Sequence, residues 1–114
     1  MKVSNLITNY GFELITDTDA SIEIKGVYSS DLLSFVMANG NSGNAWITVQ
    51  AHLNILAVAS LMEFSCIILP YGVQINAEVV KKANNENINI LKTELDHHDI
   101  YKIFIDEEEN ESIL

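Results

Sequence analysis

The fold of this chain is decided by its middle stretch, residues 45–69, which reads AWITVQAHLNILAVASLMEFSCIIL. Residues 45–50 are strand-like, residues 53–62 form a helix with almost no polar side, and residues 64–69 are the apolar run of a buried strand. A strand, a helix and a second strand at this spacing form a crossover unit, in which the two strands lie parallel in one sheet.

The residues that follow predict a second crossover unit. An amphipathic helix starts at residues 77–83, with Lys81 and Lys82 pointing outward, and a third strand at residues 88–91 precedes a closing helix at residues 96–106. Two successive βαβ units with right-handed connections predict an α/β fold, in which a layered sheet has a parallel core and helices pack on the sheet faces.

The amino-terminal third contains shorter elements. The predicted order is a helix at residues 3–10 that ends at Gly11, a brief strand at 12–15, a turn at 17–19, a strand at 22–25 that stays extended through 26–28, and a helical turn at 31–37 that ends near Gly40. We expect Ser29 or Ser30 to cap that helical turn.

The size and charge of the chain limit its function. Its 114 residues are enough for one domain, and sixteen acidic residues against six lysines give a formal net charge of −10. Because the chain has no arginine for bidentate phosphate binding and its net charge repels polyanions, we expect neither nucleic acid nor a membrane as a partner. We divide the chain into a single domain, residues 1–105, and an acidic, flexible tail, residues 106–114.

The cysteine content and the apolar runs predict a cytoplasmic protein. Cys66 is the sole cysteine and lies in an apolar run without a neighbouring cation, so we expect a buried, inert thiol. The amino terminus has too short an apolar run for a signal peptide. Residues 53–62 fall well short of the roughly 20 residues that a membrane-spanning helix needs.

A stretch with almost no charge contains the candidate ligand site. Between Leu32 and Ala77 the only formally charged side chain is Glu63, so this stretch must be largely buried and its polar groups must hydrogen-bond to protein, water or a ligand. In open parallel sheets, ligands bind beyond the carboxyl ends of the strands. The residues expected at those ends are Thr48, Gln50, His52, Asn54, Tyr71, Gly72 and Thr93.

Three of these residues, Gln50, His52 and Asn54, surround the start of the helix at residues 53–62. The unpaired N–H groups and the positive dipole end of that helix suit an anion or a carbonyl oxygen, so we expect a small anionic ligand there. The alternative is that Thr48, Gln50 or Asn54 caps the helix, while His52 hydrogen-bonds to a backbone carbonyl or a carboxylate.

The helix at Leu53–Met62 also predicts a homodimer. A helix between a sheet and water has a polar stripe, which this helix lacks, so we expect it to pack under another element or a second subunit. The small side chains of Ala57, Ala59 and Ser60 would allow close approach.

Four segments of the chain resemble a known family. They are GVYSSDLLS at residues 26–34, VMAN at 36–39, WITVQAHLN at 46–54 and AVA at 57–59. These segments are similar to the small stand-alone members of the DRTGG-domain group, over roughly residues 3–104. That domain is similar to the amino-terminal domain of HPr kinase/phosphorylase, and it also occurs in some phosphotransacetylases and in CBS-containing pyrophosphatases. The resemblance implies an α/β fold that is an accessory and dimerising module without catalysis of its own.

The chain departs from that family at one place. Where the name-giving Asp-Arg-Thr segment would fall, this chain has Ala51-His52-Leu53-Asn54, so anion recognition by that arginine is not carried over. The sequence has no glycine-rich phosphate loop ending in Gly-Lys-Ser/Thr, so the kinase half of the namesake is absent. Stand-alone members resemble accessory proteins encoded near iron–sulfur hydrogenases, which implies a regulatory or assembly partner.

The sequence contains no clear catalytic constellation. It has no Gly-x-Ser-x-Gly motif, and only His52, His97 or His98 could provide the base that a hydrolase needs. Glu94, His97 and His98 have helical spacing for a metal site, but adjacent histidines on a regular helix point about 100° apart. We expect a solvent-facing helix start there instead, and no catalytic residue, no metal and no cofactor.

These observations predict a non-catalytic regulatory or accessory domain, homodimeric, that senses a small ligand such as a nucleotide or another anion around Gln50–Asn54. The alternative is a scaffold or assembly protein, whose buried polar residues hold the fold and whose acidic surface docks a redox partner of the hydrogenase type. A third class, a small metal-dependent or acid/base enzyme, requires His52 as a catalytic group and lacks a visible second member.

Overall fold

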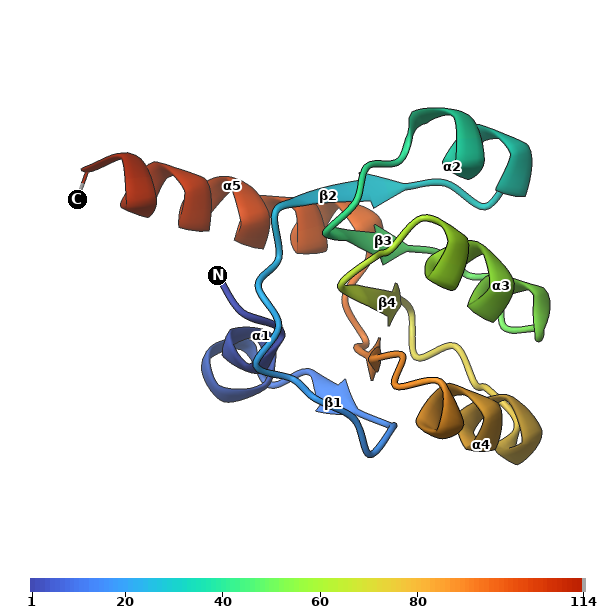
Figure 1. Ribbon diagram of the computed structural model, residues 1–114. Coiled ribbons are helices and arrows are strands. Elements are labelled where there is room, and N and C mark those ends of the chain that lie inside the picture. Colours follow the sequence, from blue (N-terminus) through green and yellow to red (C-terminus); the bar gives the residue numbers. More distant parts are fainter. Residues whose placement is uncertain (114) are drawn as a thin grey trace.

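Within residues 1–113, which the computed structural model describes, the chain forms a five-stranded sheet covered by helices on both faces (Figure 1). In chain order the elements are α1 (Val3–Tyr10), β1 (Glu13–Leu14), β2 (Gly26–Ser29), α2 (Leu33–Asn39), β3 (Asn44–Ile47), α3 (Asn54–Leu61), β4 (Cys66–Leu69), α4 (Ala77–Asn85), β5 (Ile90–Lys92) and α5 (His97–Ile113). The strand order is β1-β5-β4-β3-β2, with β1 antiparallel to β5 and the other neighbours parallel.

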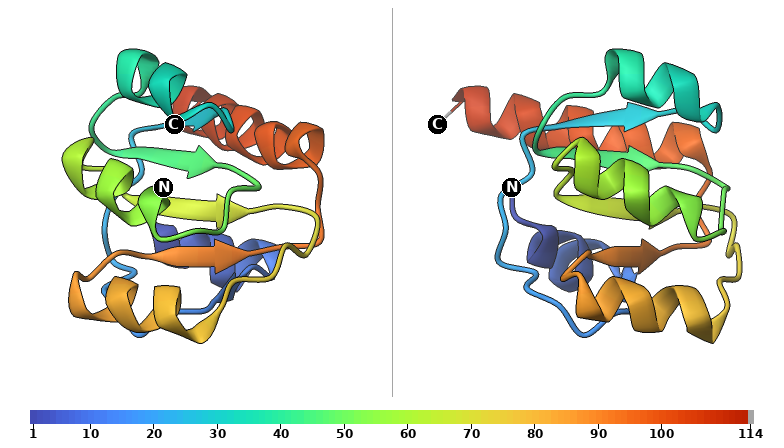
Figure 2. Two further views of the ribbon diagram at one scale, coloured as in Figure 1. Left: turned by 90° about the vertical axis from the view of Figure 1, so that its right-hand side faces the viewer. Right: turned by 45° about the vertical axis from the view of Figure 1, so that its right-hand side comes forward.

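Successive crossover units build the parallel part of the sheet. Each of α2, α3 and α4 connects two neighbouring parallel strands, and these helices lie on one face while α1 and α5 cover the other (Figure 2). The sequence predicted the units around α3 and α4, and the parallel pairing of β2 with β3 adds a further one around α2. The predicted α/β class, with a parallel core and helices on the sheet faces, is confirmed.

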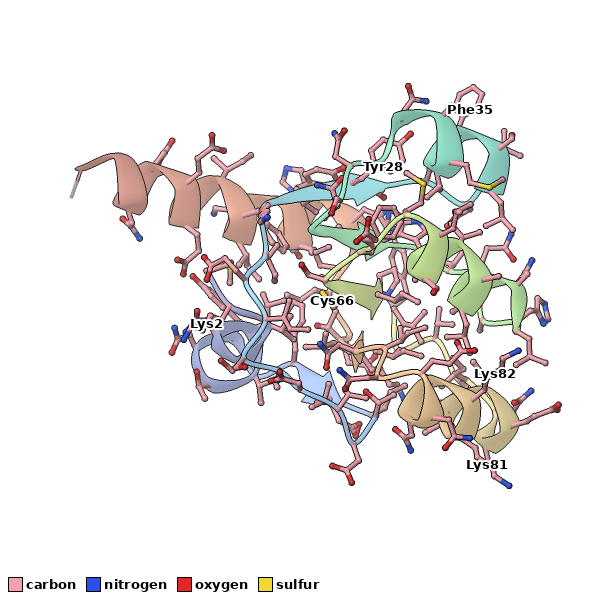
Figure 3. The ribbon with its side chains drawn as sticks, in the orientation of Figure 1. Lys2, Tyr28, Phe35, Cys66, Lys81 and Lys82 are labelled. Atoms are coloured by element: carbon pink, nitrogen blue, oxygen red, sulfur yellow. The ribbon has the colours of Figure 1, made fainter. Side chains whose placement is uncertain are left out.

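Strands β3 and β4 are buried on both faces, which explains their apolar sequences. Ala45 and Ile47 pack against α1 and α5, whereas Trp46 and Ile67 pack against the helices of the other face, and none of these side chains is exposed. Burying a large apolar side chain stabilises the fold by about 1.5–3 kcal/mol. Cys66 also lies in β4 (Figure 3), and burial raises the pKa of its thiol, as expected of an inert cysteine.

Local signals set several helix ends. Helix α1 ends where Gly11 adopts the left-handed conformation (φ 72°), which glycine reaches without a steric penalty, as predicted. The Asn76 side chain caps α4 by accepting a backbone hydrogen bond at 3.1 Å. The prediction that Ser29 or Ser30 caps α2 was wrong, because the residue before that helix is Leu32 and no side chain caps it.

The segment before β2 differs from its prediction. The alternating residues 22–25 do not form a strand, and their β-pairing in the structure is an isolated bridge between Glu23 and Lys2. Alternation predicted a strand with one wet face, with Ile22 and Ile24 on the other face. Ile24 is buried, but Ile22 is 36% exposed. The segment runs across the ends at which the parallel strands begin, here called the amino edge of the sheet. No neighbouring strand lies beside it there to form a ladder.

Buried polar side chains hold this crossing segment in place. Asn89 donates through its side-chain amide to the carbonyl oxygens of Asp19 (2.8 Å) and Ser65 (3.3 Å), and it accepts from the Thr18 hydroxyl. The Ser65 hydroxyl lies 2.7 Å from the carbonyl oxygen of Glu23. In the described part of the chain, every buried side-chain nitrogen and oxygen has a hydrogen-bond partner. These polar groups therefore serve the fold.

Helix α5 is longer than predicted and includes the acidic run. The closing helix, predicted at residues 96–106, begins at His97 and continues to Ile113. Glu107 accepts a hydrogen bond from the Tyr10 hydroxyl at 2.6 Å, which ties α5 to α1. The division into a domain at residues 1–105 and a flexible tail at residues 106–114 stays a prediction.

The outer faces of the helices differ in polarity. Lys81 and Lys82 are exposed on α4, as predicted, whereas Phe35 on α2 is 58% exposed (Figure 3). Leu61 on α3 is 70% exposed. Among residues 1–113, no helix is both long enough and apolar enough to cross a membrane.

Candidate functional site

The carboxyl ends of β2, β3, β4 and β5 meet at one edge of the sheet, where the sequence predicted a ligand site. The structure brings the seven candidate residues to this edge in three places: Thr48 and Gln50 after β3, His52 and Asn54 at the start of α3, and Tyr71, Gly72 and Thr93 at the ends of β4 and β5. The three places differ in which polar groups are already hydrogen-bonded.

Thr48 and Gln50 bond to Asp31, a residue that the sequence did not single out as a candidate. Asp31 Oδ1 accepts from the Thr48 hydroxyl and from the Val49 N–H, both at 2.9 Å. The Gln50 side-chain amide donates to the Asp31 carbonyl oxygen at 3.1 Å. These bonds fasten the loop between β2 and α2 to the end of β3, so this cluster has a structural role. The available signal was the position of Asp31, the last charged residue before the charge-poor stretch.

The start of α3 is open. His52 and Asn54 are exposed, and within the described residues their side chains make no hydrogen bond. No side chain caps the helix, and its first turn contains no acidic residue. The Ile55 and Leu56 N–H groups bond to the carbonyls of His52 and Leu53, and within the described residues the Leu53 and Asn54 N–H groups have no hydrogen-bond partner. The alternative in which a nearby side chain caps this helix was therefore wrong.

The ends of β4 and β5 meet at a crevice that is closed. The connection from β4 to α4 passes to one face of the sheet, and the connection from β5 to α5 passes to the other. In open α/β sheets, ligands bind where neighbouring connections diverge in this way. Here the Tyr71 N–H bonds to the Leu95 carbonyl (3.0 Å) and the Gly72 N–H to the Thr93 carbonyl (2.8 Å). Gly72 has φ 65°, and a Cβ on it would lie 2.6 Å from a carboxylate oxygen of Glu94. Backbone bonds thus join the two loops where a ligand would enter.

His97, which was expected at a solvent-facing helix start, is partly buried at this edge. His97 Nδ1 lies 3.0 Å from the Ser29 hydroxyl, and its ring centroid lies 5.6 Å from that of Tyr71. On the same helix, the pKa of Tyr101 is raised, mainly because the side chain is partly buried. A nucleophilic triad also needs a group that orients the histidine, and no carboxylate in the described residues is hydrogen-bonded to His97. The pair therefore ties β2 to α5.

The residues that could bind a metal at the start of α5 are not the three with helical spacing in the sequence, Glu94, His97 and His98. Among residues 1–113, the structure brings together Asp96, His98 and Asp99, with one ligand atom of each within 4.8 Å of the others. Glu94 and His97 are outside this cluster. Asp96 Oδ1 accepts from the Asp99 N–H at 2.8 Å. Capping and the helix dipole explain these acids, so we assign no metal to them.

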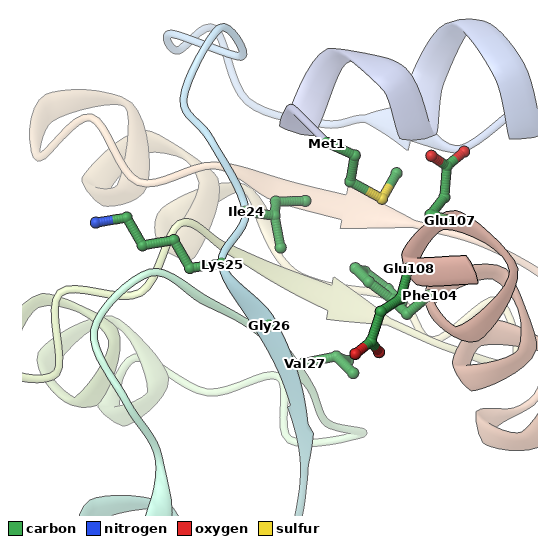
Figure 4. A pocket seen from close by; sticks show the side chains of 8 residues that line it. All are labelled: Met1, Ile24, Lys25, Gly26, Val27, Phe104, Glu107 and Glu108. Atoms are coloured by element: carbon green, nitrogen blue, oxygen red, sulfur yellow. The ribbon is translucent and has the colours of Figure 1, made fainter. Parts of the chain in front are cut away.

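The cavities lie away from the start of α3, although one of them reaches the candidate residue Thr93 at the end of β5. One of about 450 Å³ lies between the start of β2 and α5, and its lining includes Val27 and Phe104 (Figure 4). Another of about 360 Å³ lies next to the end of α1, and its lining includes Tyr10 and Thr93. The start of α3 lines neither cavity, so a ligand bound there would lie on the surface of the protein.

Comparison with known proteins bears on the fold. No family model matches the sequence, and no curated protein matches it. A similar solved structure is the crystal structure of the CBS and DRTGG domains of the regulatory region of the Clostridium perfringens pyrophosphatase, complexed with its activator, diadenosine tetraphosphate. The TM-score is 0.69 at 16% sequence identity, and the match covers 88% of this chain and 44% of that chain. This chain therefore spans less than half of the length of the structure that it matches. The likeness confirms the expectation from the sequence: this chain has the fold of a DRTGG-like domain.

Proposed function

We propose that this protein is a regulatory module without a reaction of its own, which binds a small anionic ligand at the start of α3. The fold likeness supports a regulatory role, because the similar structure is the regulatory region of an enzyme and contains a bound activator. That activator, diadenosine tetraphosphate, contains the phosphate groups that a helix amino terminus attracts.

The observation that carries this proposal is the uncapped amino terminus of α3. Asn76 caps α4 and Asp96 caps the start of α5, whereas α3 has neither a capping side chain nor an acid in its first turn. At a protein surface, the positive end of a helix dipole stabilises an anion by roughly 0.3–1 kcal/mol. Hydrogen bonds from the Leu53 and Asn54 N–H groups to a phosphate oxygen would add to this.

Charge around the site limits how the ligand binds. The Asp31 carboxylate already accepts from the Val49 N–H and repels a second anion there, so the contacts fall on the first turn of α3 and on His52 and Asn54. The net charge of −10 also opposes an anion. We therefore expect magnesium, which neutralises phosphate charge, to raise the affinity.

The test is a calorimetric and thermal-shift titration with diadenosine tetraphosphate, ATP and pyrophosphate, each with and without magnesium. We expect saturable binding of at least one of them, which weakens about fivefold or more in His52→Ala. His98→Ala removes an exposed histidine from another helix start and should leave the affinity unchanged. Equal affinities in the two variants would contradict the site. No binding of any of the three, with a stable dimer, would favour the scaffold hypothesis.

We also propose that the protein is a homodimer, formed through the outer sides of α2 and α3. Part of the apolar surface of α3 is used inside the protomer, where Ile55, Leu56 and Val58 are buried. The large apolar side chains that stay exposed on α2, α3 and the adjoining loops, here called the α2–α3 surface, are Leu32, Phe35, Met37, Val49, Leu53 and Leu61. Residues 32–62 carry no formal charge, so two strongly acidic copies can meet there without like charges in contact.

A charge placed in this surface tests the dimer. Ser60 is exposed on α3, and we expect Ser60→Glu to weaken dimerisation about tenfold or more, because it buries an unpaired carboxylate in the interface. Asn85→Glu adds the same charge to an exposed position at the end of α4 and should leave the dimer intact. Sedimentation velocity measures both. An unchanged dimer in Ser60→Glu would reject this interface, and a monomeric native protein would reject the dimer.

A further inference from the structure

An exposed tyrosine lies at the carboxyl edge of the sheet, where the connections from β4 and β5 diverge. The side chain of Tyr71 is 58% exposed and belongs to neither apolar core of the protein. Its backbone has φ 58°, a left-handed conformation that glycine reaches without penalty and that is unfavourable for a side chain this large. Strain of this kind concentrates at functional sites. The protein therefore holds an aromatic ring at its surface at a cost in stability.

Two contacts hold Tyr71 in place. Its N–H group bonds to the Leu95 carbonyl at 3.0 Å, which fixes the backbone. Its ring lies against that of His97, with the centroids 5.6 Å apart and the planes tilted by 34°. Since more than half of the side chain is open to solvent, a flat ring can stack on it without displacing the protein. Such an aromatic side chain is suited to a nucleobase, because every base has a π-face.

A carboxylate lies beside this ring. The Glu94 side chain packs over Gly72, where an added Cβ would lie 2.6 Å from Glu94 Oε2. Within the described residues, the Glu94 carboxylate has no hydrogen bond and no ion pair, so it can accept from a ligand. The amino group of adenine is a suitable donor, whereas uracil has an acceptor oxygen at the corresponding position. The negative charge of Glu94 also repels phosphate, so the neutral end of a nucleotide fits here.

We propose that Tyr71 and Glu94 bind the base of a nucleotide, whose ring stacks on Tyr71 and whose amino group donates to Glu94. This inference rests on the function proposed above, in which the anionic part of the ligand binds at the start of α3. The end of β4 and the start of α3 lie at the same edge of the sheet, because β3 and β4 are neighbouring strands (Figure 2). The ligand class thus becomes a nucleotide with an amino-bearing base.

Three probes separate the base from the phosphates: ATP, UTP and tripolyphosphate, each with magnesium. Calorimetry gives the affinities, and the side-chain proton shifts of Tyr71 and His97 locate the base. We expect ATP to bind about tenfold or more tighter than tripolyphosphate, because only ATP stacks on the ring. UTP should bind about threefold or more weaker than ATP, because it cannot donate to Glu94. Equal affinities for ATP and UTP would overturn the role of Glu94.

A matched pair of variants tests the ring. Tyr71→Phe keeps the aromatic face and should leave the affinity for ATP within about twofold of the native value. Tyr71→Gly removes the ring at a backbone conformation that glycine favours, so we expect the protein to stay folded. In this variant the affinity for ATP should fall about tenfold or more, while that for tripolyphosphate changes less than about twofold. An unchanged affinity for ATP in Tyr71→Gly would overturn the proposal.

Glu94→Ala tests the choice of base. We expect this variant to bind ATP and UTP with affinities within about twofold of each other, because the acceptor that distinguishes them is gone. A preference for ATP that persists in Glu94→Ala would contradict the role of this carboxylate.

Failure of this inference and failure of the proposed function give different results. Tripolyphosphate that binds the native protein as tightly as ATP, without shifts at Tyr71 and His97, would overturn the base site and leave the anion site at α3 standing. Binding of ATP that weakens in Tyr71→Gly but not in His52→Ala would support the base site and contradict the anion site. No saturable binding of any of the three probes would overturn both.

Discussion

The two edges of the sheet both contain buried polar side chains, but they use their polar groups differently. At the amino edge, the side chains of Asn89 and Ser65 hydrogen-bond to the segment that precedes β2. At the carboxyl edge, Asp31 and Thr48 bond to each other, and the start of α3 next to them keeps unpaired N–H groups. Buried polar side chains thus hold this fold together, whereas the unpaired backbone donors support the anion site that we propose at the start of α3.

The largest effect is expected at the amino edge. Asn89→Ala leaves the carbonyl oxygens of Asp19 and Ser65 without a donor, so we expect the free energy of unfolding to fall by about 3 kcal/mol. Urea unfolding measures this loss. Asn85→Ala, at an exposed position, is the control and should change stability by no more than about 0.5 kcal/mol. Similar values for both variants would remove the distinction between the edges.

A smaller loss is expected where the carboxyl edge is already bonded. Asp31→Ala removes the acceptor of the Thr48 hydroxyl and of the Val49 N–H, and we expect a loss of about 1–2 kcal/mol in the same assay. Asp17→Ala, which also removes an exposed carboxylate, should cost about 0.5 kcal/mol or less. If Asp31→Ala cost no more than this control, the cluster would have no structural role.

The open part of the carboxyl edge should respond in the opposite direction. Asn54→Asp places a negative charge in the first turn of α3, so we expect a gain in stability of about 0.3–1 kcal/mol. The same charge should lower the affinity for diadenosine tetraphosphate about tenfold or more, whereas Asn54→Gln adds no charge and should do neither. A gain in stability with unchanged affinity would place the ligand elsewhere.

The smallest effect concerns the contact between α1 and α5. Tyr10→Phe removes the hydrogen bond to Glu107, and we expect a loss of about 0.5 kcal/mol at neutral pH. The folded protein raises the pKa of Tyr10 from 10.0 to about 12, so it favours the protonated phenol. The contribution is therefore fully present below pH 10 and is lost as the pH rises toward 12. Urea unfolding of both proteins across this range should show the difference disappear, and a difference that grows with pH would contradict the assignment.

Local patterns in the sequence predicted much of the fold. The bounds of α1 follow from an apolar stripe and a glycine stop, and β4 follows from an uninterrupted apolar run. The strand predicted at residues 22–25 was wrong, because alternation along the chain does not show whether another strand lies alongside. The extension of α5 through the acidic run was also missed, since the Tyr10–Glu107 bond joins residues far apart in the chain.

The candidate site was predictable only in part. The crossover pattern placed His52 and Asn54 at the start of α3, where the structure has them exposed. The charge-poor composition correctly indicated buried polar groups, but the partner of Thr48 proved to be Asp31 and not a ligand. The partner of His97, the Ser29 hydroxyl, could not be predicted either, because spacing along the chain does not reveal which strand faces a helix.

The central claim is that the start of α3 is the surface kept available for an anionic ligand. The most direct measurement is a titration of the native protein with diadenosine tetraphosphate and magnesium, followed through the backbone amide chemical shifts. The account predicts that the largest saturable shifts occur at Leu53, Asn54 and Ile55, with Ser65 and Asn89 unchanged. Largest shifts at the amino edge, or no saturable shift in the first turn of α3, would contradict it.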